Sequence, residues 1–266
     1  MIKVHIFHTG RVRVDQAIPH REKNPLAVIG FLRGEKKKIT LPVSCNLNEH
    51  PKGKVLTDTG WDSKYVFERP NVFLNSISKP IIKSRESVDC KLKKVGIAPT
   101  DIDYIFFSHM DFDHTSGLRL VQDAKHIMAA REEIADSRKY FFRYVKSTWK
   151  FTRIEPFDYV QTGIGPVEKS YDVFGDGSIL LINTPGHSHG LFSAKITGDG
   201  GSYVVLAGDT AYTQKSFRER IIPGFTVDTK LAKKSLAWVC DCAADPHCRL
   251  VATNHDPSVK EQVIEL

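Results

Sequence analysis

Four side chains that can bind a metal stand within six residues of one another, namely His109, Asp111, Asp113 and His114. Only Ser108 separates them from the apolar run 104–107. An apolar run of this length, bounded by polar residues, predicts a buried strand. The chain must therefore fold so that a strand ends at a cluster of imidazoles and carboxylates, and no other feature constrains the fold as strongly.

Three later apolar runs end in a similar group. A single histidine in a loop is commonly a surface residue or a satisfied core residue, so one such position would carry little weight. Four strand ends of this kind, two of them beside a glycine, rarely coincide by chance. Imidazole and carboxylate together suit zinc, iron or manganese, and two adjacent metals would need a shared carboxylate, for which Asp209 is the natural candidate. The three later groups are His187 after the run 178–183, Asp209 after 202–207 and His255 after 249–253.

The rest of the chain reads as strands before the motif and as mixed helices and strands after it. Short or alternating apolar runs predict strands, and apolar residues three and four positions apart predict helices. Residues 115–117 supply capping groups for a helix that directly follows the motif. The predicted strands are 1–7, 26–32, 41–47, 54–57, 104–107, 178–183, 202–207 and 249–253, and the predicted helices are 88–95, 118–124 and 230–244.

The segment 132–151 mixes aromatic residues with arginines and lysines. We favour an amphipathic helical stretch that packs on the core. The alternative is that some of its aromatic side chains project over the site as a cap that faces the substrate.

Composition narrows the class of protein. A chain of 266 residues can bury a substantial core, and we expect one domain over residues 1–266 because no repeat or linker is visible. The net charge of +7 comes from 38 basic and 31 acidic residues that are interspersed, which argues against a nucleic-acid surface. No run approaches the roughly 18 apolar residues of a membrane span. Five cysteines without a signal peptide suggest reduced thiols, and we expect a cytoplasmic protein.

The residues described above resemble the metallo-β-lactamase superfamily, and specifically its N-acyl-homoserine lactonase branch. The family motif His-x-His-x-Asp-His, a later Gly-His, a bridging Asp and a final His fall on the positions named above. Residues 58–60 resemble the family's Asp-Thr-Gly turn, and 184–187 its Thr-Pro-Gly-His element. The resemblance implies an α/β fold, the αββα four-layer sandwich, and a metal-dependent hydrolase that acts on a lactone or another ester.

The resemblance also implies a ligand set for two divalent metal ions, most simply zinc. Asp111 is the departure, because the family has histidine there. An extra carboxylate would make the first metal a weaker Lewis acid and favour iron or manganese; alternatively, Asp111 falls short of the metal. The first metal would be held by His109, Asp111, His187 and Asp209, and the second by Asp113, His114, Asp209 and His255.

The expected reaction is attack of a bridging hydroxide on the carbonyl of an acyl-homoserine-lactone-type substrate. Asp113 would pass a proton to the leaving alkoxide, and Tyr212 would donate to the developing oxyanion. Asp58 would orient a ligand histidine. The alternatives are another ester, thioester or phosphoester hydrolase, or a di-iron redox protein, since the flavodiiron branch has a carboxylate at the position of Asp111. We expect a small-molecule substrate and no nucleic-acid or membrane partner, and a homodimer is compatible with the sequence.

Overall fold

The computed structural model describes residues 1–30, 32–68 and 70–266, and the strands in these ranges form two sheets. The eight-stranded sheet has the order β14-β1-β2-β3-β5-β6-β7 with β4 beside β1, and the six-stranded sheet has the order β13-β12-β11-β10-β9-β8. The strands are β1 (Lys3–Asp15), β2 (Lys38–His50), β3 (Gly53–Thr57), β4 (Ser78–Ile81), β5 (Tyr104–Phe107), β6 (His126–Ala130), β7 (Glu155–Phe157), β8 (Val160–Gln161), β9 (Lys169–Asp172), β10 (Ile179–Asn183), β11 (Phe192–Thr197), β12 (Tyr203–Leu206), β13 (Cys248–Ala252) and β14 (Gln262–Glu265).

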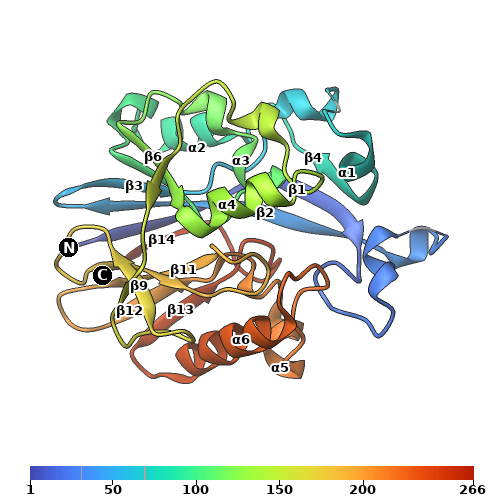
Figure 1. Ribbon diagram of the computed structural model, residues 1–266. Coiled ribbons are helices and arrows are strands. Elements are labelled where there is room, and N and C mark those ends of the chain that lie inside the picture. The colour runs from blue at the N-terminus through green and yellow to red at the C-terminus, as the bar shows by residue number, and fades with distance from the viewer. Residues whose placement is uncertain (31, 69) are drawn as a thin grey trace.

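The helices lie on the outer faces of the two sheets. Figure 1 shows the sheets facing each other, with α1 to α4 above the eight-stranded sheet and α5 and α6 below the six-stranded one. The α/β class and the four-layer αββα sandwich predicted from the sequence are thus confirmed. The helices are α1 (Val72–Ile77), α2 (Val88–Lys94), α3 (Phe112–Thr115), α4 (Arg131–Lys139), α5 (Gln214–Glu219) and α6 (Thr229–Ala244).

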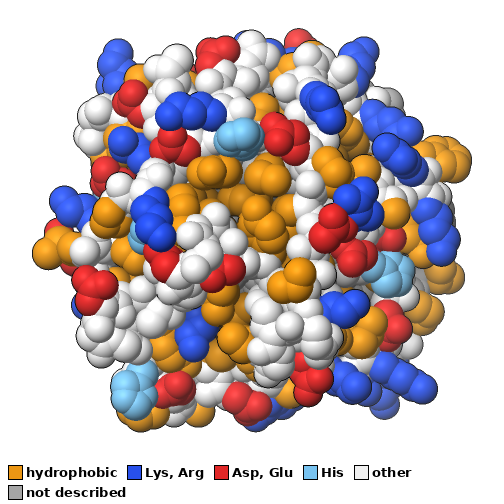
Figure 2. All heavy atoms as spheres, turned by 60° about the vertical axis from the view of Figure 1, so that its left-hand side comes forward, with side chains coloured by type: hydrophobic (Ala, Val, Ile, Leu, Met, Phe, Trp, Pro, Cys, Tyr) orange, Lys and Arg blue, Asp and Glu red, His pale blue; other side chains and the backbone are white. Residues whose placement is uncertain are grey.

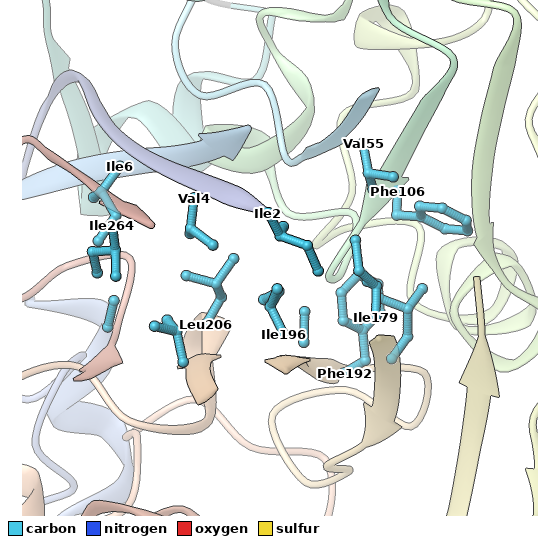
Figure 3. Packing of buried hydrophobic residues seen from close by; sticks show 14 of the residues in the cluster. Ile2, Val4, Ile6, Val55, Phe106, Ile179, Phe192, Ile196, Leu206 and Ile264 are labelled. Carbon is cyan, nitrogen blue, oxygen red and sulfur yellow. The ribbon is translucent and has the colours of Figure 1, made fainter. Parts of the chain in front are cut away.

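The main core lies between the two sheets. Successive residues of a strand point to opposite faces, so β1 sends Val4 and Ile6 toward the other sheet, where they belong to the same buried cluster as Ile196 and Leu206. Figure 3 shows these side chains between the two layers. Each fully buried aliphatic side chain contributes about 1.5–3 kcal/mol, so this layer fixes how the sheets face each other.

Two of the predicted elements are wrong. The run 26–32 is not a strand: Pro25–Ile29 forms a 3-10 helix, which the Asn24 side chain caps by accepting a hydrogen bond from the Leu26 backbone N–H, and Phe31 lies outside the described residues. The helix expected over 118–124 is only a 3-10 turn, Leu118–Leu120. The Gly117 backbone N–H bonds to the Gly60 carbonyl (2.8 Å), so the chain is held against the 58–60 turn where a helix would begin.

On the face shown in Figure 2, basic and acidic side chains are interspersed around a centre of hydrophobic ones. This agrees with the mixed charge pattern of the sequence. Among the described residues, no helix is both long enough and apolar enough to span a membrane.

Candidate metal centre

The predicted ligands follow strands whose carboxyl ends meet at one edge of the sandwich. In one sheet β3 and β5 are parallel. In the other, β12 and β13 are parallel, and β10 runs the same way as β12 because both are antiparallel to β11. The short loops after these strands bring the motif, His187, Asp209 and His255 together, although they are spread over about 150 positions of the chain.

One group of ligand atoms consists of His109, Asp111 and His187. The Oδ2 atom of Asp111 lies 3.0 Å from His187 Nε2 and 3.4 Å from His109 Nε2. Asp209 Oδ2 lies 3.7 Å from His187 Nε2 and 3.8 Å from His109 Nε2. Three side chains thus converge with one oxygen of Asp209 on a single point.

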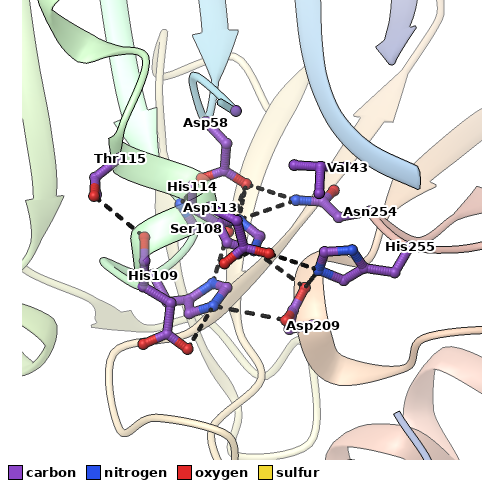
Figure 4. A network of polar contacts seen from close by, with 12 residues as sticks. Val43, Asp58, Ser108, His109, Asp113, His114, Thr115, Asp209, Asn254 and His255 are labelled. Atoms are coloured by element: carbon purple, nitrogen blue, oxygen red, sulfur yellow. Dashed lines mark hydrogen bonds and ion pairs between the residues drawn. The ribbon is translucent and has the colours of Figure 1, made fainter. Parts of the chain in front are cut away.

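A second group consists of Asp113, His114 and His255. Asp209 Oδ1 lies 3.3 Å from His255 Nε2 and 3.4 Å from His114 Nε2, and Asp113 Oδ2 lies 3.5 Å from His255 Nε2. Figure 4 shows Asp209 between the histidines of the two groups. Each carboxylate oxygen of Asp209 therefore faces a different group, which is the arrangement that a bridging ligand requires.

Backbone contacts of the Nδ1 atoms point the Nε2 atoms of His187 and His255 into the centre. His187 Nδ1 lies 2.6 Å from the Phe225 carbonyl oxygen, and His255 Nδ1 lies 2.8 Å from that of Pro42. A carbonyl oxygen only accepts, so each Nδ1 carries the proton and donates it, which leaves the Nε2 lone pair free.

Asp58 holds His114 and the start of the motif in place. Its Oδ2 atom accepts from His114 Nδ1 (2.9 Å), Ser108 Oγ (2.8 Å) and Asn254 Nδ2 (2.9 Å), and its Oδ1 atom accepts from the Ser108 backbone N–H (2.8 Å). Figure 4 shows this network. Asp58 adopts a left-handed backbone conformation (φ +61°), which aspartate tolerates better than most residues. The turn after β3 thus aims a fully buried carboxylate at the motif.

Three buried polar atoms at the centre have no hydrogen-bond partner among the described residues: His109 Nε2, His114 Nε2 and Asp209 Oδ1. Buried polar atoms are nearly always satisfied, so three such atoms that converge call for a ligand. Nitrogen lone pairs and carboxylate oxygens are the donors that zinc, iron and manganese take. The residues therefore fit a pair of divalent metal ions.

The electrostatics of the centre favour positive charge. Burial alone would lower the pKa of His114, but the nearby carboxylates of Asp58, Asp209 and Asp113 raise it well above its ordinary value. Burial would likewise raise the pKa of Asp209, whereas His255, His114 and His109 hold it well below the ordinary range. A bound cation would benefit from the same field.

Tyr212 lies at the edge of the centre. It is buried, and its ring stacks on His255 with 4.8 Å between centroids and an interplanar angle of 14°. Burial raises the pKa of the phenol well above its ordinary value, and the charges of Asp209 and Asp113 add to the rise. The hydroxyl therefore keeps its proton at neutral pH and can donate it in a hydrogen bond.

A cavity that opens to solvent leads to the centre. Its floor is polar and formed by residues of the two groups, together with Tyr212. Its wall is apolar and draws on β1 and on α1, far from the motif in sequence. The apolar lining residues are Val12, Val14, Ile18, Leu74, Ile77, Phe112 and Phe225.

Comparison with known proteins assigns the chain to a family. A model of the Metallo-beta-lactamase superfamily matches residues 39–253. The chain belongs to this superfamily. The resemblance drawn from the motifs is thereby confirmed, and with it the prediction of a metal-dependent hydrolase.

The relatives are consistent with the lactonase branch. The chain is 28% identical to the N-acyl homoserine lactonase AttM of Azorhizobium caulinodans over 241 residues, which cover 85% of this chain and 86% of the relative. It is 27% identical to the N-acyl homoserine lactonase AiiA of Bacillus thuringiensis subsp. kurstaki, with coverage of 88% and 85%. A solved N-acyl homoserine lactone hydrolase, with the product N-hexanoyl-L-homoserine bound at its catalytic metal center, superposes with a TM-score of 0.78 at 25% identity and covers 98% of each chain.

The structure adds a residue to this superfamily site that the sequence analysis missed. Arg143 is 4% exposed, lines the cavity and contacts Asp111. It comes from the segment 132–151, which is helical only over α4 and a 3-10 turn, Lys146–Thr148. Among the described residues of this segment, Arg143 rather than an aromatic side chain lines the cavity, and Phe141 and Phe142 are exposed. The extra carboxylate at Asp111 and the basic character of the segment 132–151 were both visible in the sequence, but no local pattern links them.

Proposed function

We propose that this protein opens the ring of N-acyl homoserine lactones by hydrolysis at a binuclear metal centre. The observation that carries the proposal is Asp209, whose two carboxylate oxygens face two separate groups of imidazole and carboxylate ligands at the floor of a cavity with an apolar wall. The relatives named lactonases support the choice of substrate.

We assign His109, Asp111, His187 and Asp209 to the first metal, and Asp113, His114, Asp209 and His255 to the second. We place zinc first among the metals, and iron or manganese remain alternatives because of Asp111. When bound, the two ions would supply a hydroxide at neutral pH and polarise the lactone carbonyl.

The side chains of the chain itself position the substrate and move its protons. The apolar wall, which includes Val14 and Ile18, binds the acyl chain and excludes water from it. The Tyr212 hydroxyl donates a hydrogen bond to the carbonyl oxygen as negative charge develops there. The Asp113 carboxylate, which lines the cavity, takes the proton that the attacking hydroxide gives up and delivers it to the ring oxygen as that oxygen leaves.

We also propose that the enzyme works in the cytoplasm. All five cysteines are free. Cys242 and Cys248 belong to one packed cluster and still form no disulfide. Free thiols in this number fit a reducing compartment.

The proposal is tested with full-length protein supplied in turn with zinc, manganese and iron. We expect the hydrolysis of N-acyl homoserine lactones to exceed that of thioesters and phosphoesters. We also expect Tyr212→Phe to lower kcat by roughly 10²–10³-fold, the usual loss for one oxyanion donor. Tyr203→Phe is the matched control, because this buried phenol bonds to Asp245 in another part of the molecule. Failure to open any lactone with all three metals, or oxygen or nitric-oxide reduction by the iron form instead, contradicts the proposal.

A further inference from the structure

Asp111 and Arg143 form a two-pronged ion pair in the floor of the cavity. Arg143 Nε donates to Asp111 Oδ1 (2.5 Å), and Arg143 Nη2 donates to Asp111 Oδ2 (2.7 Å). The guanidinium is almost fully buried, and the carboxylate is 19% exposed. A bidentate pair of this kind fixes the direction of the carboxylate as well as its charge.

The other contacts of Arg143 tie it to the same subsite. Its Nη1 donates to the carbonyl oxygen of His187 (2.7 Å), and its Cζ lies 5.0 Å from the centre of the Phe225 ring. The carbonyl of Phe225 in turn accepts from His187 Nδ1. The one guanidinium therefore braces the carboxylate of Asp111 and the backbone of His187, two of the three residues in the first group.

The pairing leaves Asp111 able to bind a metal. Its Oδ2 atom lies 3.0 Å from His187 Nε2 and 3.4 Å from His109 Nε2, and so it points at the same place as both imidazoles. A carboxylate oxygen can accept more than one partner, so the contact with Arg143 does not exhaust it.

We propose that Asp111 and Arg143 act together as one neutral ligand of the first metal, with Arg143 as the positioning residue. This inference rests on the proposed two-metal site. The carboxylate supplies the oxygen, and the guanidinium aims it and cancels its charge. The pair thus presents the first metal with the net charge of a single neutral imidazole, and the weakening of that metal's Lewis acidity expected from Asp111 alone is offset.

The pair must then be replaced as a unit. With Arg143→Gln, the carboxylate regains its negative charge but loses its orientation. We expect the loss of orientation to outweigh the added attraction, so that the first metal binds roughly 10–100-fold more weakly, the usual effect of removing an outer partner of a ligand. With Asp111→His, the guanidinium is left beside a divalent ion without its counter-charge, and the repulsion also weakens binding. With Asp111→His and Arg143→Gln together, both faults disappear and binding recovers.

The test is a double-mutant cycle on zinc binding, measured by chelator competition and by elemental analysis of the dialysed protein, without any activity assay. We expect two zinc ions per chain in the wild type, an affinity for the first zinc that is roughly 10–100-fold weaker in each single variant, and recovered affinity in the double variant. The second zinc, held by the other ligand group, reports in every variant that the fold is intact. Arg131→Gln is the matched control, since Arg131 makes the same two-pronged contact with Asp158 (2.6 and 2.8 Å) on the surface, and it should keep both ions.

The outcomes separate this inference from the proposed function. Fewer than two zinc ions in the wild type contradicts the two-metal site itself. If the wild type binds two ions and Arg143→Gln binds the first zinc as tightly as the wild type, the proposed role of Arg143 is overturned and the two-metal site is not. If Arg143→Gln does not fold, Asp111→His is compared with the double variant. Equal affinity of these two proteins for the first zinc contradicts the coupling between Asp111 and Arg143. Tighter binding of the first zinc by the double variant supports the coupling.

Discussion

Asp58 gives the sharpest prediction about how the chain prepares its ligands. The carboxylate accepts four hydrogen bonds, three at Oδ2 and one at Oδ1, from His114, Ser108 and Asn254. It is fully buried, so water cannot replace a lost partner. Substitution by asparagine changes one oxygen into an NH₂ group of nearly the same size, and this isolates the effect of the acceptor.

Neither orientation of the new amide restores the network. If its NH₂ group faces the Ser108 backbone N–H, two buried donors oppose each other, which costs about 1–3 kcal/mol. If the NH₂ group faces His114 Nδ1, that nitrogen must become an acceptor, the proton moves to Nε2, and the imidazole can no longer bind a metal. We therefore expect Asp58→Asn to weaken the binding of the second metal by roughly 10–100-fold, or about 1.4–2.7 kcal/mol.

The assay is chelator competition with zinc, run beside Asp103→Asn as a control. Asp103 also accepts a backbone hydrogen bond (from Lys54, 2.7 Å) and pairs with Lys125, but it lies at the opposite end of β5. The control should lose some stability and no zinc affinity. An Asp58→Asn protein that binds its second zinc as tightly as the wild type and is equally stable to urea would refute the assignment of Asp58 as the residue that sets the His114 tautomer.

Three further predictions follow from other parts of the structure. Chelation of the metals should lower the melting temperature by roughly 5–11 °C, since a ligand at a hundredfold excess over its Kd contributes about 2.7 kcal/mol; an unchanged scanning calorimetry trace contradicts this. Gly60→Ala should cost at least about 2 kcal/mol in urea unfolding, because φ is +61° and a Cβ would lie 1.7 Å from Thr9 Oγ1. Gly175→Ala, with φ +71° and no atom within 4 Å, should lose clearly less, and equal losses argue against the contact. Finally, each methylene that the substrate buries on the apolar wall contributes about 0.8 kcal/mol and should raise kcat/KM about fourfold. Val14→Trp should abolish this gain for long acyl chains. A loss of kcat/KM that is uniform across chain lengths contradicts the assignment of the wall.

The loops that carry the candidate ligands could be predicted from the sequence because each follows an apolar run of strand length. The run 104–107 matches β5, and the motif follows directly. The strand and the candidate ligands are neighbours in the sequence, so a local pattern was enough to predict both. Asp58 was predicted from the resemblance of 58–60 to the family's Asp-Thr-Gly turn, which follows the run 54–57. A local pattern cannot predict a contact between two residues that are far apart in the sequence. Arg143 lies 32 positions from Asp111, and nothing near either residue in the sequence connects them.

The same limit explains the other differences between prediction and structure. The helix expected over 118–124 has suitable apolar spacing, but Gly117 is held by Gly60, which is 57 positions earlier. Val12 and Val14 lie beyond the strand expected over 1–7, and only the packing of the longer β1 beside the motif makes them part of the cavity wall. Local propensity gives way wherever a tertiary contact takes up the backbone group or the side chain.

The most direct test of the account is the identity of the product. Metal-loaded full-length protein is incubated with an N-acyl homoserine lactone, and the products are identified by NMR. We predict the ring-opened N-acyl homoserine with its amide intact, formed by the wild type and not by Asp209→Asn, which removes the carboxylate shared by the two ligand groups. An unchanged lactone with zinc, manganese and iron, or a product in which the amide is cleaved and the ring is kept, would contradict the proposed lactonase.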